Sequence, residues 1–253
     1  MSMSSVRIAA AQSVSVPGDI VNNVATHCNF ITEASTYNVD IVVFPELSLC
    51  GYELPLIRDY VLHPDDQILA PIRKLASEKS ISVVVGAPVL SSSNHIYIGA
   101  ITFLPNGKFS VYCKQYLHAG EEYFVSASTT PCKPYQVGRE IVSLAICADT
   151  SHDKHPQSAA DAGASLYLAS VLVSDKGYVT DAGNLQRYAE RYGMSTLMAN
   201  HGGPTGGYIS AGKSSFWSQE GELIIAAPSV GQYLVIASKN SESWTGDLRK
   251  IET

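Results

Sequence analysis

The sequence predicts an α/β fold in which two sheets pack together and helices cover them on the outside. The first third of the chain alternates apolar runs with a segment of helical periodicity, which is typical of a sheet covered by helices. Several later apolar runs are joined by hairpin turns. There are more strand-like runs than one doubly wound sheet needs, so a second sheet is expected.

The N-terminal third predicts the order β-α-β-α-β. Ile20, Val24 and Ile31 recur at helical spacing, which indicates an amphipathic helix. The flanking runs are almost wholly apolar and are expected as buried strands. The expected elements are strand Val6–Gln12, helix Asp19–Tyr37, strand Asp40–Phe44, a helix around Asp66–Lys79 and strand Ser82–Pro88.

The rest of the chain adds hairpins and a second β-α-β pattern. Pro105-Asn106-Gly107 is a turn signal between the expected strands Ile96–Leu104 and Phe109–Lys114. Apart from a short turn at Ser91–Ser93 there is no linker-like segment, so we expect one domain over residues 1–253. The later elements are expected as strand Ile141–Ile146, helix Pro156–Ala162, strand Leu166–Ala169, helix Asn184–Tyr192, strands Ser195–Ala199, Lys213–Trp217 and Leu223–Ala226, and a closing strand Tyr233–Ser238.

The composition excludes some classes of protein. Hydrophobic residues make up 45% of the 253 residues, so the chain is not disordered and can bury a large core. The formal net charge is −6 and no basic stripe is present, which argues against nucleic acid or a membrane surface as a partner. Charged residues make up only 16%, against about 25% on average. We therefore expect another subunit to cover part of the surface, in a homodimer or higher homo-oligomer.

The expected location is the cytoplasm. The N-terminus has no apolar signal-peptide region. The longest apolar stretches, Ile81–Leu90 and Ser165–Val173, are shorter than the roughly 20 residues that span a bilayer. The 5 cysteines form no C-x-x-C pair, so reduced thiols are expected rather than a disulfide framework.

A phosphate-binding loop motif is present but does not have the context that its chemistry requires. Gly207–Ser214 matches G-x-x-x-x-G-K-[ST]. A nucleotide-binding loop needs a helix directly after it, so that the N-terminus of the helix faces the phosphates. Here Ser214–Trp217 leads at once into a turn at Gln219–Gly221 and another strand. A chance match in a glycine-rich loop is the better interpretation.

A metal site is a second possibility. His152 and His155 are three residues apart, with Cys147, Asp149 and Asp153 nearby, and two such imidazoles can share one helix face. Pro156 places this segment in a loop or a first helical turn. Solvated histidines are the better interpretation, and a metal-dependent hydrolase using His152 and His155 stays a weaker alternative.

Three polar residues follow the ends of apolar strands. Each of them has an ordinary interpretation: Glu46 as a turn carboxylate, Lys114 as a surface lysine and Cys147 as an inert buried thiol. Active sites, however, assemble at the carboxyl ends of strands in open α/β sheets. Together, a carboxylate, a lysine and a thiol can supply a base, an oxyanion stabiliser and a nucleophile.

The segments around these residues resemble the signature blocks of the nitrilase superfamily of carbon–nitrogen hydrolases. The three blocks are Phe44–Leu47, Tyr112–Leu117 and Ile146–Asp149, in order and at suitable spacing. Gln186–Gly202 is similar to the family's helix–strand–Asn segment and Gly212–Gly221 to its Gly-x-Ser hairpin. The resemblance extends from Val6 to about Ile236. It implies a four-layer α-β-β-α sandwich with two central mixed sheets and members that commonly pair as dimers.

The resemblance also implies a role for each residue. Glu46 would be the general base, Lys114 the cationic group, Cys147 the nucleophile and Glu121 a second glutamate that supports the lysine, with Glu122 as the alternative in register. The backbone N–H of Ala148 would share the oxyanion site with Lys114. The Lys114 cation is expected to favour the Cys147 thiolate.

The loops expected to line the pocket are 47–56, 118–125 and 171–179, and Tyr52 and Val171 are the substrate-binding candidates within them.

The activity implied is hydrolysis of a small amide or N-carbamoyl compound without a cofactor. Several amidases and carbamoylases of the family carry an arginine soon after the Cys-x-Asp, but here those positions hold Thr150 and Ser151. Recognition of a substrate carboxylate is therefore in doubt, unless a cation elsewhere supplies it. Arg187, Arg191 and Lys176 are the candidates for that cation. A catalytically silent binding protein of the same fold is the second alternative.

Overall fold

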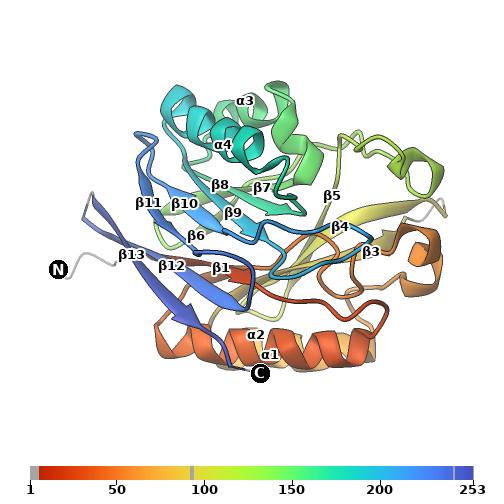
Figure 1. Cartoon of the computed structure of the whole chain (residues 1–253). Helices are drawn as coiled ribbons and strands as arrows, with labels where there is room; N and C mark the ends of the chain where they lie inside the picture. The colour runs from red at the N-terminus through yellow and green to blue at the C-terminus, as the bar shows by residue number, and fades with distance from the viewer. Residues whose placement is uncertain (1–5, 92–93, 242, 253) are drawn as a thin grey trace.

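The computed structural model describes residues 6–91, 94–241 and 243–252, and within them the chain forms four layers (Figure 1). Helices α1 (Ile20–Thr36) and α2 (Ala70–Glu78) cover one sheet, and α3 (Lys154–Asp161) and α4 (Tyr178–Tyr192) cover the other. The predicted α-β-β-α sandwich with two central mixed sheets is confirmed. Two features weighed in the sequence, the first residues of the N-terminus and the turn at Ser91–Ser93, lie partly outside the described residues.

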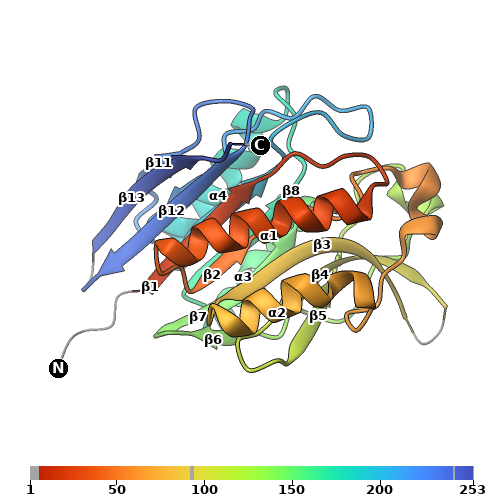
Figure 2. The same ribbon diagram turned by 90° about the horizontal axis from the view of Figure 1, so that it is seen from below.

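The first sheet has 7 strands in the order β13-β12-β1-β2-β3-β4-β5. Its three inner strands β1, β2 and β3 run parallel, and the other pairs are antiparallel. Figure 2 shows α1 and α2 side by side across this sheet. The strands are β1 (Val6–Gln12), β2 (Ile41–Val43), β3 (Ser82–Leu90), β4 (Ile96–Phe103), β5 (Phe109–Cys113), β12 (Tyr233–Asn240) and β13 (Ser243–Lys250).

The second sheet has 6 strands in the order β11-β10-β9-β8-β7-β6. Strands β7, β8 and β9 are parallel, so the carboxyl ends of β7 and β8 lie at one edge of the sheet. The strands are β6 (Tyr135–Val137), β7 (Glu140–Ile146), β8 (Leu166–Val171), β9 (Ser195–Asn200), β10 (Ser215–Trp217) and β11 (Leu223–Ala226).

The main core lies between the two sheets. Ile8 and Val43 of the first sheet belong to the same buried cluster as Leu144 and Leu197 of the second. The intervening residues of the first sheet, such as Ala9, face α1 and α2 in a separate cluster. Both faces of the inner strands are therefore buried, which explains why these strands are apolar at successive positions rather than at alternate ones.

The structure corrects the sequence analysis at the C-terminus and in α4. Tyr233–Ser238 does not close the chain, because β13 follows and pairs with β12 at the sheet edge. The β13 sequence has little apolar alternation because edge strands tolerate polar residues. Helix α4 begins at Tyr178 rather than at Asn184. Its first turns contain Val179, Thr180 and Gly183, which have low helix propensity and hid the start of the helix.

The helices pack on the sheets by one face. The longest, α1, has 17 residues, and its buried positions include Val24, Phe30 and Ile31.

A helix that crosses a bilayer needs about 20 apolar residues. Among the described residues, no helix is long and apolar enough to do so.

Candidate active site

Three strand ends bring Glu46, Lys114 and Cys147 together. Glu46 lies in the turn after β2, and Lys114 and Cys147 directly follow β5 and β7. The side chains of Glu46 and Lys114 are 0% exposed, and Cys147 is partly exposed to a cavity. The ordinary interpretations of Glu46 as a solvated turn carboxylate and Lys114 as a surface lysine are therefore wrong.

Lys114 bridges two buried carboxylates. Its Nζ donates to Glu46 Oε1 at 2.6 Å and to Glu121 Oε1 at 2.7 Å. Glu121 also accepts hydrogen bonds from the Tyr52 hydroxyl and, at 2.8 Å, from the His118 backbone N–H. Glu122 is exposed and accepts a bond from the Gly120 N–H instead. Of the two neighbouring glutamates, Glu121 is the one in contact with Lys114.

The pKa values in this cluster follow from burial and from the charges in contact. Burial raises the pKa of Glu46, Lys114 lowers it and Glu121 raises it, giving a net value of about 7. Burial alone would lower the pKa of Lys114, but Glu46 and the neighbouring acids more than offset this and raise it. Lys114 is therefore a permanent cation, whereas Glu46 exchanges a proton near neutral pH.

The Cys147 thiol is held at the start of a tight turn. Its backbone φ is +42°, and its Sγ donates to the Leu172 carbonyl oxygen at 3.7 Å. Burial and then Glu46 raise the pKa of Cys147, and the opposing effect of Lys114 is smaller. The resting group is the neutral thiol, so the expected thiolate is not formed by Lys114 alone and a base must remove the proton.

One oxygen of Glu46 is free to act as that base. Oε1 accepts from Lys114, whereas the buried Oε2 has no hydrogen-bond partner among the described residues. Glu46 and Cys147 line the same small cavity. A buried acceptor without a donor is costly in a folded protein, and proton transfer to it from a neighbouring thiol would satisfy it.

Asp149 fastens the turn of Cys147 to the segment that follows Lys114. Its Oδ2 accepts from the Ile146 backbone N–H at 2.9 Å, and its Oδ1 accepts from the N–H groups of Gln115 at 3.1 Å and Tyr116 at 2.9 Å. The Tyr112 hydroxyl adds a further bond to Oδ2 at 2.6 Å. In the sequence Asp149 stands out only as part of a motif, and its positioning function could not be predicted from it.

The turn that carries Glu46 is fixed from several sides. The adjacent Leu47 has φ +52°, and a side chain on Gly86 would collide with the backbone of Pro45 and Leu47. His201 Nε2 lies 2.7 Å from the Glu46 carbonyl oxygen. Burial lowers the pKa of His201 to about 4, so the neutral ring donates there. No pattern in the sequence indicates this partner.

The thiol opens into two connected hollows. The smaller is about 30 Å³ and contacts Glu46, Tyr52 and Cys147. The larger is about 230 Å³ and shares Cys147 with it. That is below the roughly 300–1,000 Å³ of pockets for drug-sized ligands. The larger hollow is lined by His118, Cys147, Ala148, Thr150, Ser151, Leu172, Val173, Ser174, Gly177, Asp181 and Tyr208.

The expected lining residues are only partly those of the cavity. Tyr52 lines the smaller hollow and Ala148 lines the larger one. Val171 instead lies in the core under α4 and is 1% exposed. The next residues, Leu172 and Val173, line the larger hollow. Val171 is the last residue of β8, so it is still packed within the sheet. Tyr208 and Asp181 were missed, because they come from segments distant in sequence.

The expected alternative cations are not in the cavity. Arg187 and Arg191 each form an ion pair with Asp153 at 3.2 Å, and Lys176 is exposed and does not line either hollow.

Asn200, at the end of β9, joins the wall of the site at Val173 to the loop of Gly212. Its Oδ1 accepts from the Val173 N–H at 2.9 Å, and its Nδ2 donates to the carbonyls of Val173 and Gly212 at 2.9 and 2.8 Å. A side chain on Gly212 would come within 2.5 Å of the Ser229 carbonyl oxygen. Gly212 of the phosphate-binding loop motif therefore allows close backbone packing. The motif is followed directly by strand β10 rather than by the helix that a nucleotide-binding loop needs.

The metal alternative is not supported by the surroundings of its two histidines. Both ring nitrogens of His155 have hydrogen-bond partners, the hydroxyls of Tyr112 and Tyr167. His152 stacks on Tyr116, with 4.0 Å between ring centroids. Among residues 6–91, 94–241 and 243–252, no group of three potential ligands is placed to hold a metal ion.

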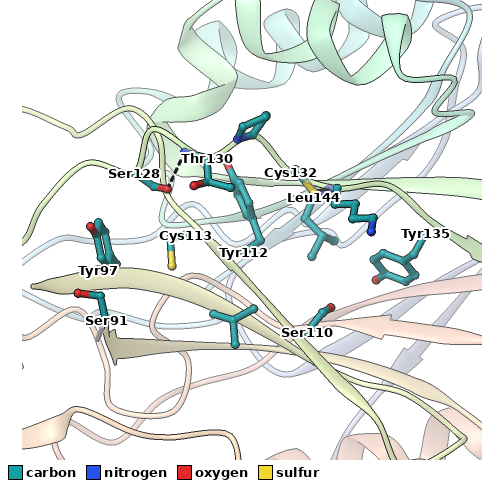
Figure 3. A pocket seen from close by; sticks show the side chains of 13 residues that line it. Ser91, Tyr97, Ser110, Tyr112, Cys113, Ser128, Thr130, Cys132, Tyr135 and Leu144 are labelled. Atoms are coloured by element: carbon teal, nitrogen blue, oxygen red, sulfur yellow. Dashed lines mark hydrogen bonds between the residues drawn. The ribbon is translucent and has the colours of Figure 1, made fainter. Parts of the chain in front are cut away.

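A further cavity of about 370 Å³ lies beside β5 and the segment that leads to β6 (Figure 3). Tyr112 contributes to its wall, and Cys113 and Cys132 are close by (Figure 3). Glu46, Lys114 and Cys147 do not line it. We therefore place the chemistry at the smaller hollows around Cys147.

A model of a known protein family matches almost the whole chain. A model of the carbon–nitrogen hydrolase family matches residues 7–246.

Solved structures of an amidase from Nesterenkonia sp. AN1 have the same fold. A cysteine-to-serine variant, described as from the nitrilase superfamily, is 25% identical with a TM-score of 0.83, over 93% of this chain and 91% of that chain. A cysteine-to-alanine variant in complex with butyramide is 24% identical with a TM-score of 0.85, over 94% and 92%. A third structure, with the acetamide moiety of fluoroacetamide added covalently at the active-site cysteine, is 24% identical with a TM-score of 0.83, over 91% and 89%.

Proposed function

This chain belongs to the carbon–nitrogen hydrolase family, and from that premise we propose that it cleaves the C–N bond of a small amide or N-carbamoyl compound through a thioester on Cys147. The observation that carries the proposal is the arrangement around Glu46. Its Oε1 is held by Lys114, its buried Oε2 has no partner among the described residues, and Glu46 lines the same cavity as the thiol. The catalytic group would be Glu46, Lys114 and Cys147, with Glu121 in support.

The first chemical step is attack on the amide carbonyl. Glu46 Oε2 takes the thiol proton as the Cys147 Sγ–carbon bond forms, and the carbonyl π electrons move to the oxygen. Lys114 and the Ala148 backbone N–H would then stabilise the oxyanion. Preorganised donors of this kind each lower a barrier by roughly 3–4 kcal/mol.

Collapse of the adduct completes the acylation. The oxyanion electrons re-form the carbonyl, the C–N bond breaks, and protonated Glu46 transfers its proton to the leaving nitrogen, which departs as ammonia or an amine. Water then attacks the thioester with Glu46 accepting its proton. The carboxylic acid leaves and the proton returns to Cys147 Sγ, so the cycle needs no cofactor.

Glu121 would act through Lys114. It holds the ammonium group together with Glu46 and is itself held by Tyr52 and by the His118 N–H. A buried cation with two carboxylates keeps its charge throughout the cycle. In this proposal Tyr52 and Glu121 position the cation and Lys114 contacts the reacting oxygen.

The organisation of the chain is part of the proposal. We propose that residues 1–253 form one domain, because the buried cluster between the sheets contains residues from both halves of the chain. The low charged fraction of 16% supports a homodimer or higher homo-oligomer. The 5 cysteines are free thiols, which supports a reducing cytoplasmic environment.

The test is ammonia release from short aliphatic amides, ω-amides of dicarboxylates, N-carbamoyl compounds and nitriles. The wild type should release ammonia from at least one amide or carbamoyl compound, and Cys147→Ala should not. Cys28→Ser is the matched control, because Cys28 lies on α1 away from the cavity and should keep the wild-type rate. Equal rates in Cys147→Ala and the wild type would contradict the proposal, and an intact fold without any turnover would favour a catalytically silent binding protein.

A further inference from the structure

The larger hollow beside Cys147 contains one acidic side chain. Asp181 lies in the first turn of α4 and lines the cavity together with Cys147. It is half-buried, and none of the ion pairs found among the described residues includes it. Within the part of the chain that the structure describes, no ion-pair partner balances this carboxylate in the cavity beside the thiol.

The other walls of the hollow are neutral or weakly basic. Thr150, Ser151 and Ser174 contribute hydroxyl groups, and no lysine or arginine of the described ranges lines this cavity. The Thr150 hydroxyl is already engaged, since it donates to the Cys147 carbonyl oxygen at 2.8 Å. His118 also lines the hollow. Burial raises the pKa of Asp181, and the smaller charge effect of His118 lowers it.

Gly177 leaves space beside the Asp181 carboxylate. Gly177 precedes α4, and a side chain carbon there would lie 3.0 Å from Asp181 Oδ2. Gly177 lines the same hollow. Because glycine occupies this position, a ligand group of small size can reach the carboxylate.

We propose that Asp181 is a specificity residue that receives the cationic end of the substrate, so that the preferred substrates are small amides with an ammonium group on the acyl chain. The inference rests on the proposed hydrolysis at Cys147. An amide bound to the thiol has the rest of its chain in the hollow that Asp181 lines. A cation there gains a charge-assisted hydrogen bond, whereas a substrate carboxylate meets a like charge without a compensating arginine.

The test compares three amides of similar size: γ-aminobutyramide with an ammonium end, valeramide with a methyl end and succinamate with a carboxylate end. For the wild type, kcat/KM should be about tenfold higher for γ-aminobutyramide than for valeramide, and lowest for succinamate. Asp181→Asn should remove most of the preference for the ammonium amide. Asp175→Asn is the matched control, because Asp175 is exposed and does not line the cavity, and it should keep the preference.

A binding measurement separates this inference from the proposed reaction. Calorimetry on Cys147→Ala should show γ-aminobutyramide binding about tenfold tighter than valeramide, and the added change Asp181→Asn should abolish the difference. Selective binding without turnover by the wild type would overturn the reaction and keep the role of Asp181. Turnover without a preference for the ammonium amide, or a preference that Asp181→Asn leaves intact, would overturn the role of Asp181 alone. No turnover together with no selective binding would overturn both.

Discussion

The Asp149 carboxylate accepts a hydrogen bond of 3.1 Å from the backbone N–H of Gln115, the residue that follows Lys114. The same carboxylate accepts from the Ile146 N–H, which precedes Cys147. The end of β5 belongs to one sheet and the end of β7 to the other. Asp149 therefore fixes the separation between the lysine and the thiol across the two sheets.

We expect Asp149→Asn to lower both stability and activity. In asparagine an NH₂ group replaces one of the two carboxylate oxygens. The buried N–H groups that donate to this oxygen in the wild type then lose their acceptor, at a cost of about 2–4 kcal/mol of unfolding free energy. Displacement of the lysine from the thiol should reduce kcat on the order of 100-fold. Denaturant unfolding and amide turnover are the measurements. Asp161→Asn, at an exposed end of α3, should change stability by less than about 0.5 kcal/mol, and an equal effect of the two changes would contradict this role.

Gly86→Ala should damage the site from a neighbouring strand. The added carbon would lie 2.9 Å from the Glu46 carbonyl carbon and would collide with the backbone on both sides of that residue. We expect a loss of about 2 kcal/mol or more and a fall in kcat, since the base would shift. Gly183→Ala, in an open position of α4, should instead stabilise the protein by about 0.5–1 kcal/mol. Wild-type stability and turnover in Gly86→Ala would show that the turn can relax without consequence.

The activity should depend on pH through Glu46. Its pKa is raised to about 7, and it must be ionised to accept the thiol proton, so kcat/KM should rise with pH through about 7 and level off above it. Below that value the protonated carboxyl cannot act as the base. The measurement is kcat/KM on one amide between about pH 5 and about pH 9. A flat profile, or Glu46→Gln with the wild-type rate, would exclude Glu46 as the base.

Stability should depend on pH through His27. Its ring lies under the Glu46 turn, stacked on Phe44 at 4.0 Å and within 2.9 Å of the Ser48 hydroxyl. Burial lowers its pKa from 6.5 to about 4, so the unfolded chain binds more protons between these values. The contribution of the neutral ring is therefore complete above pH 6.5 and is lost as the pH falls to about 4.

Replacing that ring should make the stability less sensitive to acid. Between those two pH values, the unfolding free energy of His27→Gln should fall less steeply than that of the wild type, by about 1.4 kcal/mol per pH unit, which corresponds to one proton. Denaturant unfolding at several pH values measures both slopes. Identical slopes would show that His27 is not the group that titrates. His201, with a pKa of about 4 for the same reason, should remain as a second contribution in both proteins.

Much of the fold could be predicted from local patterns. Strands such as β3 and β7 are buried on both faces, so their apolar runs stand out in the sequence. β13 did not stand out, because an edge strand with exposed positions needs no apolar run. The first turns of α4 were hidden because its packing against the sheet, rather than helix propensity, stabilises them.

The residues of the site likewise fall into those that could be predicted from the sequence and those that could not. Glu46, Lys114 and Cys147 follow strands, so their positions could be predicted to converge at strand ends. Asp149 and His201 act through contacts between segments that are distant in sequence, and Asp181 lines the cavity from the first turn of α4. Such arrangements leave no periodicity or spacing in the chain. The protonation state of Cys147 was likewise beyond the sequence, because it depends on burial as well as on Lys114.

The most direct test of the central claim is capture of the acyl group on Cys147. The wild type is quenched in acid during steady turnover of a short amide and digested, and the peptides are weighed. The peptide containing Cys147 should gain the mass of the acyl group, and the same peptide of Cys147→Ala should not. Sustained turnover with an unmodified Cys147 peptide, together with full activity in Cys147→Ala, would contradict it.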